Sequence, residues 1–410
     1  MLGEFAYSVR FPSPRDEDRM RLIYAPNGRG KTNFLRAVNA ALVATPESLQ
    51  ALIEIPIARL RIGFQDGGSI AIERRKSVVG SFEATATESE DAESKTVSVD
   101  PSDFAGRLYR RVWDEREDYS GFSSLVSKMT PGAVFIGDDR LATTVDDTRD
   151  SARDAHVFAG VRKRPGTVTR LLDTVERLLT QSAFASLSRE SAHSGIYGQI
   201  TRTTLEGSAR IAATTARNNL ERQIERLVRD GTPLERYELI SMRQVRDISN
   251  QIGSVRANDS KLPALHRILT PYFDSLEQQI ESLGPAQELI DTYVTSVNKF
   301  LDRKSLVFTA SRGIRLVGRD GSHLQPESLS SGERHLILLL SQAILATAER
   351  PLVIIDEPEL SLGIEWQRDL LPELLRCSQS GCVQFLIASH SVQVMSAVDR
   401  AEIVRPLELS

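Results

Sequence analysis

The stretch that decides the fold is residues 329–359, which read LSSGERHLILLLSQAILATAERPLVIIDEPE. A Ser/Gly turn opens an apolar segment of helical length, the segment ends at Arg350-Pro351, and the fully apolar strand Leu352–Ile355 follows. The first turn of a helix offers unpaired backbone N–H groups to an anion such as phosphate. Ser330, Ser331 and Gly332 would let that backbone come close to the anion.

Two carboxylates, Asp356 and Glu357, come directly after the apolar strand. Open α/β sheets bind their ligands at the carboxyl ends of the strands. Carboxylates at such an end suit Mg²⁺ and an attacking water. The stretch therefore predicts one half of a nucleotide-hydrolysing site.

The other half lies near the N-terminus, where the short strand Arg21–Tyr24 runs into residues 25–32, APNGRGKT. This is the spacing of a phosphate-binding P-loop: glycines permit a close approach, Lys31 would reach the β and γ phosphates, and Thr32 would hold Mg²⁺. An ordinary Gly-rich turn between a strand and a helix is the alternative. The predicted nucleotide-binding residues are Asn27, Gly28, Arg29, Gly30, Lys31, Thr32 and Asn33.

Composition is that of a soluble globular protein, with 410 residues, 40% hydrophobic and 26% charged. The length allows two or three domains, or one domain with a large insertion. A net charge of -4 argues against a protein that binds polyanions over its whole surface. Two cysteines indicate no disulfide framework, and we see neither a signal peptide nor an apolar run of membrane-spanning length, so we expect a cytoplasmic protein.

Between the two halves we expect further sheet elements. The runs Ala58–Phe64 and Ser69–Arg75 alternate around a Gly-rich turn and predict an antiparallel hairpin. The polar stretch Glu83–Asp103 reads as a surface loop. The short strand Ala133–Ile136 precedes a Gly-Asp-Asp-Arg turn, which places Asp139 near the predicted metal site.

From residue 152 to about 303 the pattern is mainly helical. Ile200–Val228 and Leu234–Val255 are amphipathic and flank Gly231-Thr-Pro233, which predicts an antiparallel helical hairpin of about 40–45 Å with its tip there. A second break is expected at Gly284-Pro285. Residues 151–260 carry 17 Lys and Arg against 12 Asp and Glu, which leaves two interpretations open: a solvated helix face, or contact with nucleic acid or protein.

Four motifs in order make a family resemblance visible. APNGRGKT resembles the Walker A motif, LSSGE the ABC signature, VIIDEPE the Walker B motif with its catalytic glutamate, and ASH the switch histidine. The set is similar to the SMC/RecF/OLD-like branch of ABC ATPases, above all to the ATPases of bacterial antiphage systems such as PARIS and Septu. The sequence departs from the family pattern at three positions. Ala25 stands in place of the first P-loop glycine, and Asp139 in place of the Q-loop glutamine. Gly363 stands where relatives often carry a histidine or an aspartate, in the loop that contacts the other subunit.

The resemblance implies an α/β fold, an ABC-type P-loop NTPase head with a mixed sheet core and an antiparallel β subdomain, plus a large helical coiled-coil insertion. It divides the chain into an N-terminal lobe with Walker A (1–150), the insertion with its arm (151–303), and a C-terminal lobe with signature, Walker B and switch histidine (304–410).

The resemblance also implies residue roles in hydrolysis of ATP with Mg²⁺. Thr32, Asp356 and Asp139 would hold the metal, Glu357 would polarise the water, and His390 would contact the γ-phosphate. In such ATPases the signature completes the site of a second subunit, which implies an ATP-sandwiched homodimer or a higher oligomer. The signature residues that would bind this ATP are Ser330, Ser331, Gly332 and Glu333.

Three functions remain open at this point. The first is an ATPase whose dimer closure controls a separate effector, such as a Toprim or HNH nuclease or a toxin, in antiphage defence. The second is a RecF- or SMC-like ATPase of DNA repair or chromosome structure. An ATPase of this second kind would contact DNA, whereas the first would contact a phage protein. The third, a transport ATPase, fits less well, because transporter subunits carry no long helical insertion at this place.

Overall fold

The computed structural model describes residues 5–11, 19–75, 77–89, 93–105, 109–130, 132–137, 142–143, 167–188, 211–349, 352–379, 383–397 and 402–408. Its contacts group into two compact units, Met1–Val168 with Leu329–Ser410, and Thr169–Ser328. The first joins most of the two predicted lobes, and the second holds the predicted insertion together with three strands that follow it. Within the described ranges, no helix has the length and apolar character needed to cross a membrane.

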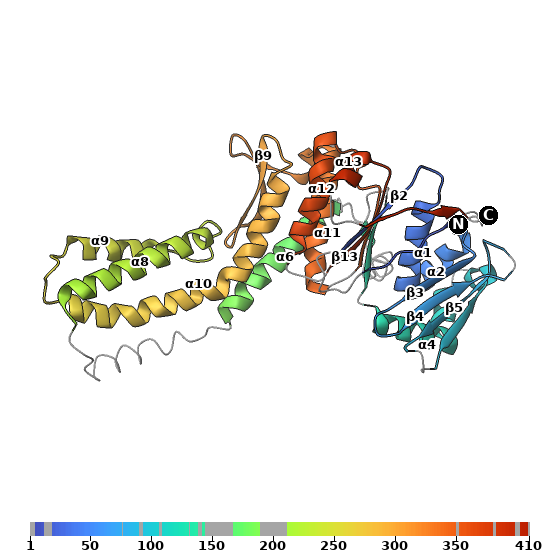
Figure 1. Ribbon diagram of the computed structural model, residues 1–410, viewed down its shortest axis with the longest axis horizontal. Helices are drawn as coiled ribbons and strands as arrows, with labels where there is room; N and C mark the ends of the chain where they lie inside the picture. The colour runs from blue at the N-terminus through green and yellow to red at the C-terminus, as the bar shows by residue number, and fades with distance from the viewer. Residues whose placement is uncertain are drawn as a thin grey trace, which may run out of the picture. The chain divides into compact units, whose positions relative to one another are not determined.

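A six-stranded sheet forms the centre of the first unit (Figure 1). Its strands are β14 (Glu402–Val404), β2 (Met20–Tyr24), β13 (Gln384–Ser389), β12 (Leu352–Asp356), β7 (Ala133–Ile136) and β8 (Ala142–Thr143), in that spatial order. All neighbours are parallel except the β7–β8 pair. Tyr24 pairs with Ser389, and Asp356 with Ala388. The carboxyl ends of β2, β13 and β12 therefore lie in line at one edge.

Helix α1 (Lys31–Val43) lies between this sheet and a second one. It contacts β7, β12 and β13 on one side, and β3 (Arg59–Gly63) and β4 (Ser69–Glu73) on the other. The predicted hairpin is thus confirmed, since β3 and β4 pair antiparallel. Helices α2 (Pro46–Glu54), α3 (Tyr109–Asp114) and α4 (Glu117–Met129) complete this lobe.

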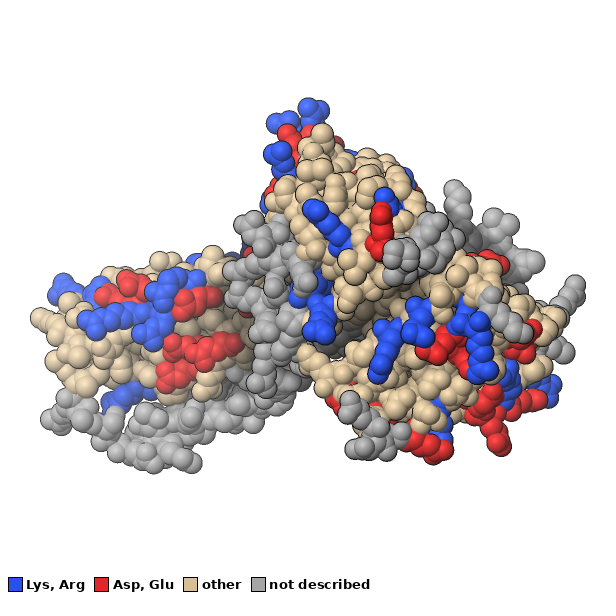
Figure 2. Space-filling view, turned by 45° about the vertical axis from the view of Figure 1, so that its right-hand side comes forward, with Lys and Arg blue, Asp and Glu red and all other residues tan. Residues whose placement is uncertain are grey.

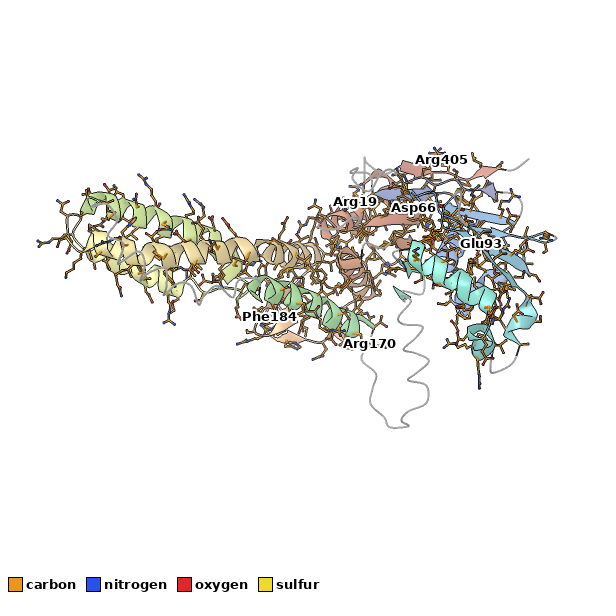
Figure 3. The ribbon with its side chains drawn as sticks, turned by 90° about the horizontal axis from the view of Figure 1, so that it is seen from below. Arg19, Asp66, Glu93, Arg170, Phe184 and Arg405 are labelled. Atoms are coloured by element: carbon orange, nitrogen blue, oxygen red, sulfur yellow. The ribbon has the colours of Figure 1, made fainter. Side chains whose placement is uncertain are left out.

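The prediction of a surface loop at Glu83–Asp103 is wrong. Strands β5 (Phe82–Thr87) and β6 (Lys95–Val99) extend the second sheet to four strands. Ala84, Ala86, Val97 and Val99 are buried at every second position and carry the alternation of a strand. Alanine is too weakly apolar for that pattern to stand out among the polar residues of the sequence. Figure 3 labels Asp66, which accepts the Gly68 N–H in the β3–β4 turn.

The signature stretch forms helix α11 (Ser331–Glu349), which packs on α12 (Ile364–Cys377) and contacts β12. The short helix α13 (Val392–Ser396) follows β13 and packs on α12. Figure 1 shows α1 on one side of the six-stranded sheet and α11 and α12 on the other. The two ends of the chain pair as β1 (Phe5–Ala6) and β15 (Leu407–Glu408).

The second unit begins with α6 (Thr167–Ser188), on which Figure 3 labels Arg170 and the exposed Phe184. Its arm consists of α8 (Ala213–Glu235), α9 (Arg243–Ser254) and α10 (Leu262–Asn298). The antiparallel sheet β9 (Lys304–Thr309), β10 (Gly313–Gly318) and β11 (His323–Leu324) and a 3₁₀ turn, η3 (Pro326–Ser328), close it.

The predicted two-helix hairpin is corrected in two respects. Its turn is not at Gly231-Thr-Pro233, because those residues lie inside α8. The chain turns after Glu235, and there the Ala310 N–H donates to the Tyr237 carbonyl, so this turn adjoins the β9–β10 connection. Arg217, near the start of α8, donates to the Val255 carbonyl after α9. The far end of the arm is therefore formed by the start of α8 and the residues between α9 and α10.

Helix α10 is the main partner of α8, and the two run in the same direction. Gln223 donates to Asp274, Arg226 pairs with Glu277, and Tyr237 donates to Asp291. Residue numbers therefore increase in the same direction along both helices. The break predicted at Gly284-Pro285 is wrong, since α10 continues through both residues. Loss of one backbone hydrogen bond at a proline costs about 3 kcal/mol. Burial of the neighbouring α10 side chains offsets that cost; these include Leu283, Ala286 and Ile290.

The predicted fold class is confirmed. The first unit is an α/β P-loop head with a mixed sheet and an antiparallel β subdomain, and a large helical insertion interrupts it in sequence.

Candidate functional site

Three connections follow the aligned strand ends of the first unit. β2 leads into the P-loop, β12 into Glu357, and β13 into His390. Because their parallel strands are neighbours in register, these connections emerge at the same edge. The structure thus brings the predicted Walker A, Walker B and switch-histidine segments together.

The P-loop has the conformation that its glycines allow. Gly28 and Gly30 have φ angles of 82° and 80°, in the left-handed region that side chains disfavour. Helix α1 starts at Lys31 without a side-chain cap, so its first backbone N–H groups are open to an anion. The Lys31 ammonium is buried and donates to the Ala25 carbonyl at 2.7 Å. A phosphate oxygen in this loop could replace that acceptor.

Arg29 is held by the paired chain ends, which the sequence did not indicate. Its guanidinium lies 4.7 Å from the Phe5 ring centroid and 2.5 Å from a Glu408 carboxylate oxygen. The Tyr7 hydroxyl donates to the Arg29 carbonyl at 2.6 Å. Burial raises the pKa of Tyr7 to about 12, so the hydroxyl stays a donor at neutral pH. The Arg29 side chain therefore braces the P-loop against the paired chain ends.

The remaining predicted P-loop residues lie on the same turn. Asn27 is exposed, and Thr32 and Asn33 are half-buried in the first turn of α1.

The end of β12 carries strain at the predicted catalytic position. Asp356 is buried, and Glu357 has a φ of 50° although it is not glycine. A side chain in this region costs on the order of 1 kcal/mol or more, and such strain is concentrated at functional sites. The Glu357 N–H donates to the Ala388 carbonyl at 2.8 Å, which fixes the backbone against β13.

His390 faces two carboxylates. Its Nδ1 lies 3.3 Å from Oε1 of Glu357 and 3.2 Å from Oε1 of Glu359. The imidazole is 43% exposed, so its far side remains open at the sheet edge. Glu359 was not singled out from the sequence. The only signal was a third carboxylate two positions after Glu357, inside a run already assigned to Walker B.

The signature residues cap their own helix. The Ser330 N–H donates to the Glu333 carboxylate at 2.6 Å, and the Ser330 hydroxyl accepts the Glu333 N–H at 3.2 Å. This reciprocal pair is a capping box. It uses two of the donors that we expected to meet a phosphate and leaves the Ser331 and Gly332 N–H groups without a role in the box. Ser330 and Ser331 are exposed, whereas Gly332 and Glu333 are buried.

Gly332 has no room for a side chain. A Cβ there would lie 2.8 Å from the Ser361 carbonyl oxygen. We expect Gly332→Ala to lower the free energy of unfolding by about 1–3 kcal/mol, because backbone cannot yield as a flexible side chain does. Gly121→Ala, within helix α4, is the matched control. A Cβ at Gly121 would lie 3.7 Å from its nearest neighbour, Cδ of Lys95, so this substitution should be neutral or stabilising. Urea unfolding of both variants decides this; equal stability would show that the signature turn is not packed as described.

A Mg²⁺ ion fits the donors at this edge. The Thr32 hydroxyl and the buried Asp356 carboxylate are hard oxygen ligands. In the described part of the chain, no group of three His, Cys, Asp or Glu residues could enclose a metal by itself. Mg²⁺ suits such a site, since it keeps waters and binds through one or two protein ligands together with substrate phosphates. The third predicted ligand, Asp139, lies outside the described residues.

Part of this chain is similar to a known family of AAA domains. Residues 211–396 match the family described as "AAA domain, putative AbiEii toxin, Type IV TA system". The match contains the signature, Walker B and the switch histidine, and the P-loop at residues 25–32 precedes it. This supports an ATPase of the AAA/ABC type. The chain matched none of the curated proteins.

Similar solved structures include three SMC heads. One is the Smc head domain of Pyrococcus furiosus with an extended coiled coil, bound to the C-terminal domain of ScpA, at 13% identity and a TM-score of 0.37, covering 96% of this chain and 91% of that one. The Smc head of Pyrococcus yayanosii with a coiled coil and joint has 13% identity, a TM-score of 0.35 and coverages of 96% and 93%. The SMC head domain of Thermotoga maritima has 11% identity and a TM-score of 0.29, and the match covers 96% of this chain and 91% of that one.

Proposed function

We propose that the protein is a Mg²⁺-dependent ATP hydrolase that works as a homodimer and controls a separate effector in antiphage defence. The observation that supports ATP hydrolysis most directly is the common edge of β2, β13 and β12. It places a P-loop, a strained carboxylate and a histidine between two carboxylates at adjacent strand ends.

Each residue has a part in phosphoryl transfer. The open N–H groups of α1 and the Lys31 ammonium bind the β and γ phosphates and offset the charge that develops on them. Thr32 and Asp356 would hold Mg²⁺, which would supply further charge neutralisation. Glu357 orients the water that attacks the γ-phosphorus and accepts its proton as the bond to the bridging oxygen breaks. ADP and inorganic phosphate result. His390 contacts the γ-phosphate through its exposed side.

A second copy supplies the signature. Ser330 and Ser331 are exposed at a helix start, and the two N–H groups outside the capping box can donate to a phosphate of a neighbouring molecule. α1 and α11 lie on opposite sides of their own sheet (Figure 1), which supports a signature that serves another P-loop. A homodimer around two ATP molecules, or a larger assembly of such dimers, satisfies both elements.

The defence role rests on the matched family, whose description names a toxin of a type IV toxin–antitoxin system. We propose that ATP-driven closure acts in the cytoplasm on a separate effector, a Toprim or HNH nuclease or a toxin, and that a phage protein is the trigger.

Replacing Lys31 with alanine should abolish ATP binding and, with it, protection against phage. Loss of one partner of a buried charge pair costs 2–5 kcal/mol, so the dissociation constant should rise by roughly 10²-fold or more. Titration calorimetry measures binding, and plaque counts in cells with the neighbouring genes measure protection. Lys128→Ala is the control: Lys128 pairs with Glu88 on the surface, and such pairs contribute little. Protection by a Lys31→Ala protein that binds no ATP would refute ATP control.

The alternative, a DNA-associated ATPase, has less support from the arm. Residues 211–298 carry 10 Lys and Arg against 12 Asp and Glu. Arg226 of α8 pairs with Glu277, and Arg236, the residue that follows α8, pairs with Asp291. Figure 2 shows basic and acidic side chains interleaved on this unit. DNA binding with a steep salt dependence that Arg222→Glu reduces would favour this alternative.

A further inference from the structure

The residues after β12 and after β13 are joined through one buried carboxyl group, that of Glu359. Its Oε1 accepts the Ser389 hydroxyl at 2.6 Å, the His390 N–H at 3.0 Å and the Ser391 N–H at 3.1 Å. The side chain is 5% exposed. Three donors converging on one buried oxygen are what a carboxylate needs in order to be stable away from water.

The backbone of the Walker B turn aims Glu359 at this position. Glu357 takes its left-handed conformation directly after the strand, and the Leu360 N–H donates back to the Glu357 carbonyl. The Leu362 N–H donates to the Glu359 carbonyl at 3.0 Å. These bonds form a tight turn that brings Glu359 back against the end of β13. The strain at Glu357 thus places two carboxylates, not one, beside His390.

The contact with the imidazole goes beyond holding the loop. The same Oε1 lies 3.2 Å from Nδ1 of His390, and Oε1 of Glu357 lies 3.3 Å from that nitrogen. An acceptor beside Nδ1 favours the tautomer with its proton there and sets the ring orientation. The second carboxyl oxygen, Oε2, is buried and meets no hydrogen-bond donor among the residues that the structure describes. The useful bonds of Glu359 therefore all pass through Oε1.

The loop that carries His390 is fixed from the other side as well. The Ser391 hydroxyl donates to Oε1 of Gln367 at 2.7 Å and accepts the Val394 N–H at the start of α13. Nε2 of Gln367 donates to the Leu362 carbonyl at 2.9 Å. The backbone around His390 thus has several supports. The imidazole is held at this edge by Glu357 and Glu359.

We propose that Glu359 is the positioning residue for His390: it accepts a hydrogen bond from Nδ1 and so fixes the orientation in which the ring presents its Nε2 edge to the nucleotide. This inference rests on the proposed ATP hydrolase. It links Walker B to the switch histidine within one subunit, so that a shift of the turn at Glu357 moves the histidine with it.

A double-mutant cycle tests this coupling. Glu359→Ala should lower kcat on the order of 10²-fold with little change in ATP affinity, because misplacement of a reacting or sensing group by about 1 Å has that effect. Glu359→Gln keeps an oxygen acceptor at Oε1 and should restore kcat to within a few-fold of the wild type. In a His390→Ala background, Glu359→Ala should have no further effect. Additive losses in the double variant, or no rescue by glutamine, would overturn the proposal.

A spectroscopic measurement separates this proposal from the ATPase itself. Nitrogen-15 NMR of the labelled imidazoles, with the His390 signal assigned from His390→Ala, should show the Nδ1-protonated form in the wild type and in Glu359→Gln. Glu359→Ala should shift this signal toward the other tautomer. Glu373→Gln removes another buried carboxylate, on α12, and should leave both the signal and kcat unchanged. An unchanged signal in Glu359→Ala would refute the positioning role even where hydrolysis is shown. Absence of hydrolysis with the expected shift would refute only the ATPase.

Discussion

Glu357→Gln should bind ATP with wild-type affinity and hydrolyse it roughly 10³-fold more slowly, since general-base assistance contributes about 10²–10⁴-fold. Glutamine has the shape of glutamate and can still accept a hydrogen bond at the position 3.3 Å from Nδ1 of His390. It cannot take a proton from the attacking water. We also expect ATP to hold this variant in a stable dimer, because the ATP-bound dimer forms and its ATP is not hydrolysed. Single-turnover hydrolysis and light scattering with ATP measure the two effects.

Two controls make that result specific. Asp356→Asn removes a predicted Mg²⁺ ligand, so its defect should include weaker binding of the Mg²⁺–ATP complex as well as slow hydrolysis. Glu365→Gln alters an exposed carboxylate in the first turn of α12 and should behave as the wild type. Hydrolysis by Glu357→Gln at the wild-type rate would exclude Glu357 as the base.

The sequence predicted the parts of this fold that combine a motif with a strong apolar pattern. β12, β13 and β2 are short runs of large apolar residues that end in Asp356, Ser389 and Tyr24, and both their positions and their polar ends are as expected. The P-loop glycines have the positive φ angles that their spacing indicated.

Tertiary packing decided the parts that the sequence did not predict. Proline at 233 and 285 reads as a helix break, yet both residues lie inside helices whose buried faces pack on each other. β5 is buried through Ala84 and Ala86, whose small side chains give a faint alternation. The role of Glu359 depends on a left-handed residue two positions earlier, and no propensity scale for glutamate predicts that conformation.

Two inactive subunits should restore activity when they are mixed. Lys31→Ala removes the P-loop function and leaves an intact signature. Ser330→Arg places a bulky cation at the exposed signature serine and leaves an intact P-loop. A mixed dimer then contains one complete site and one with both defects, so it should hydrolyse ATP at about half the wild-type rate, since a two-fold interface makes the two sites equivalent.

Stability must be matched before the mixture is interpreted. Ser330→Arg also removes a helix cap, which costs about 1 kcal/mol, so thermal unfolding has to confirm that the variant is folded at the assay temperature. Ser322→Arg adds the same charge at another exposed serine, one that bonds to Asp320, and should retain full activity.

The shared site is the central claim, and the ATPase rate of the Lys31→Ala and Ser330→Arg mixture tests it most directly. With mixed dimers quantified by differently tagged subunits, we predict that the rate rises in proportion to their amount, while each variant alone stays inactive. Mixed dimers that form and remain as inactive as their parents would contradict a site built from the P-loop of one subunit and the signature of the other.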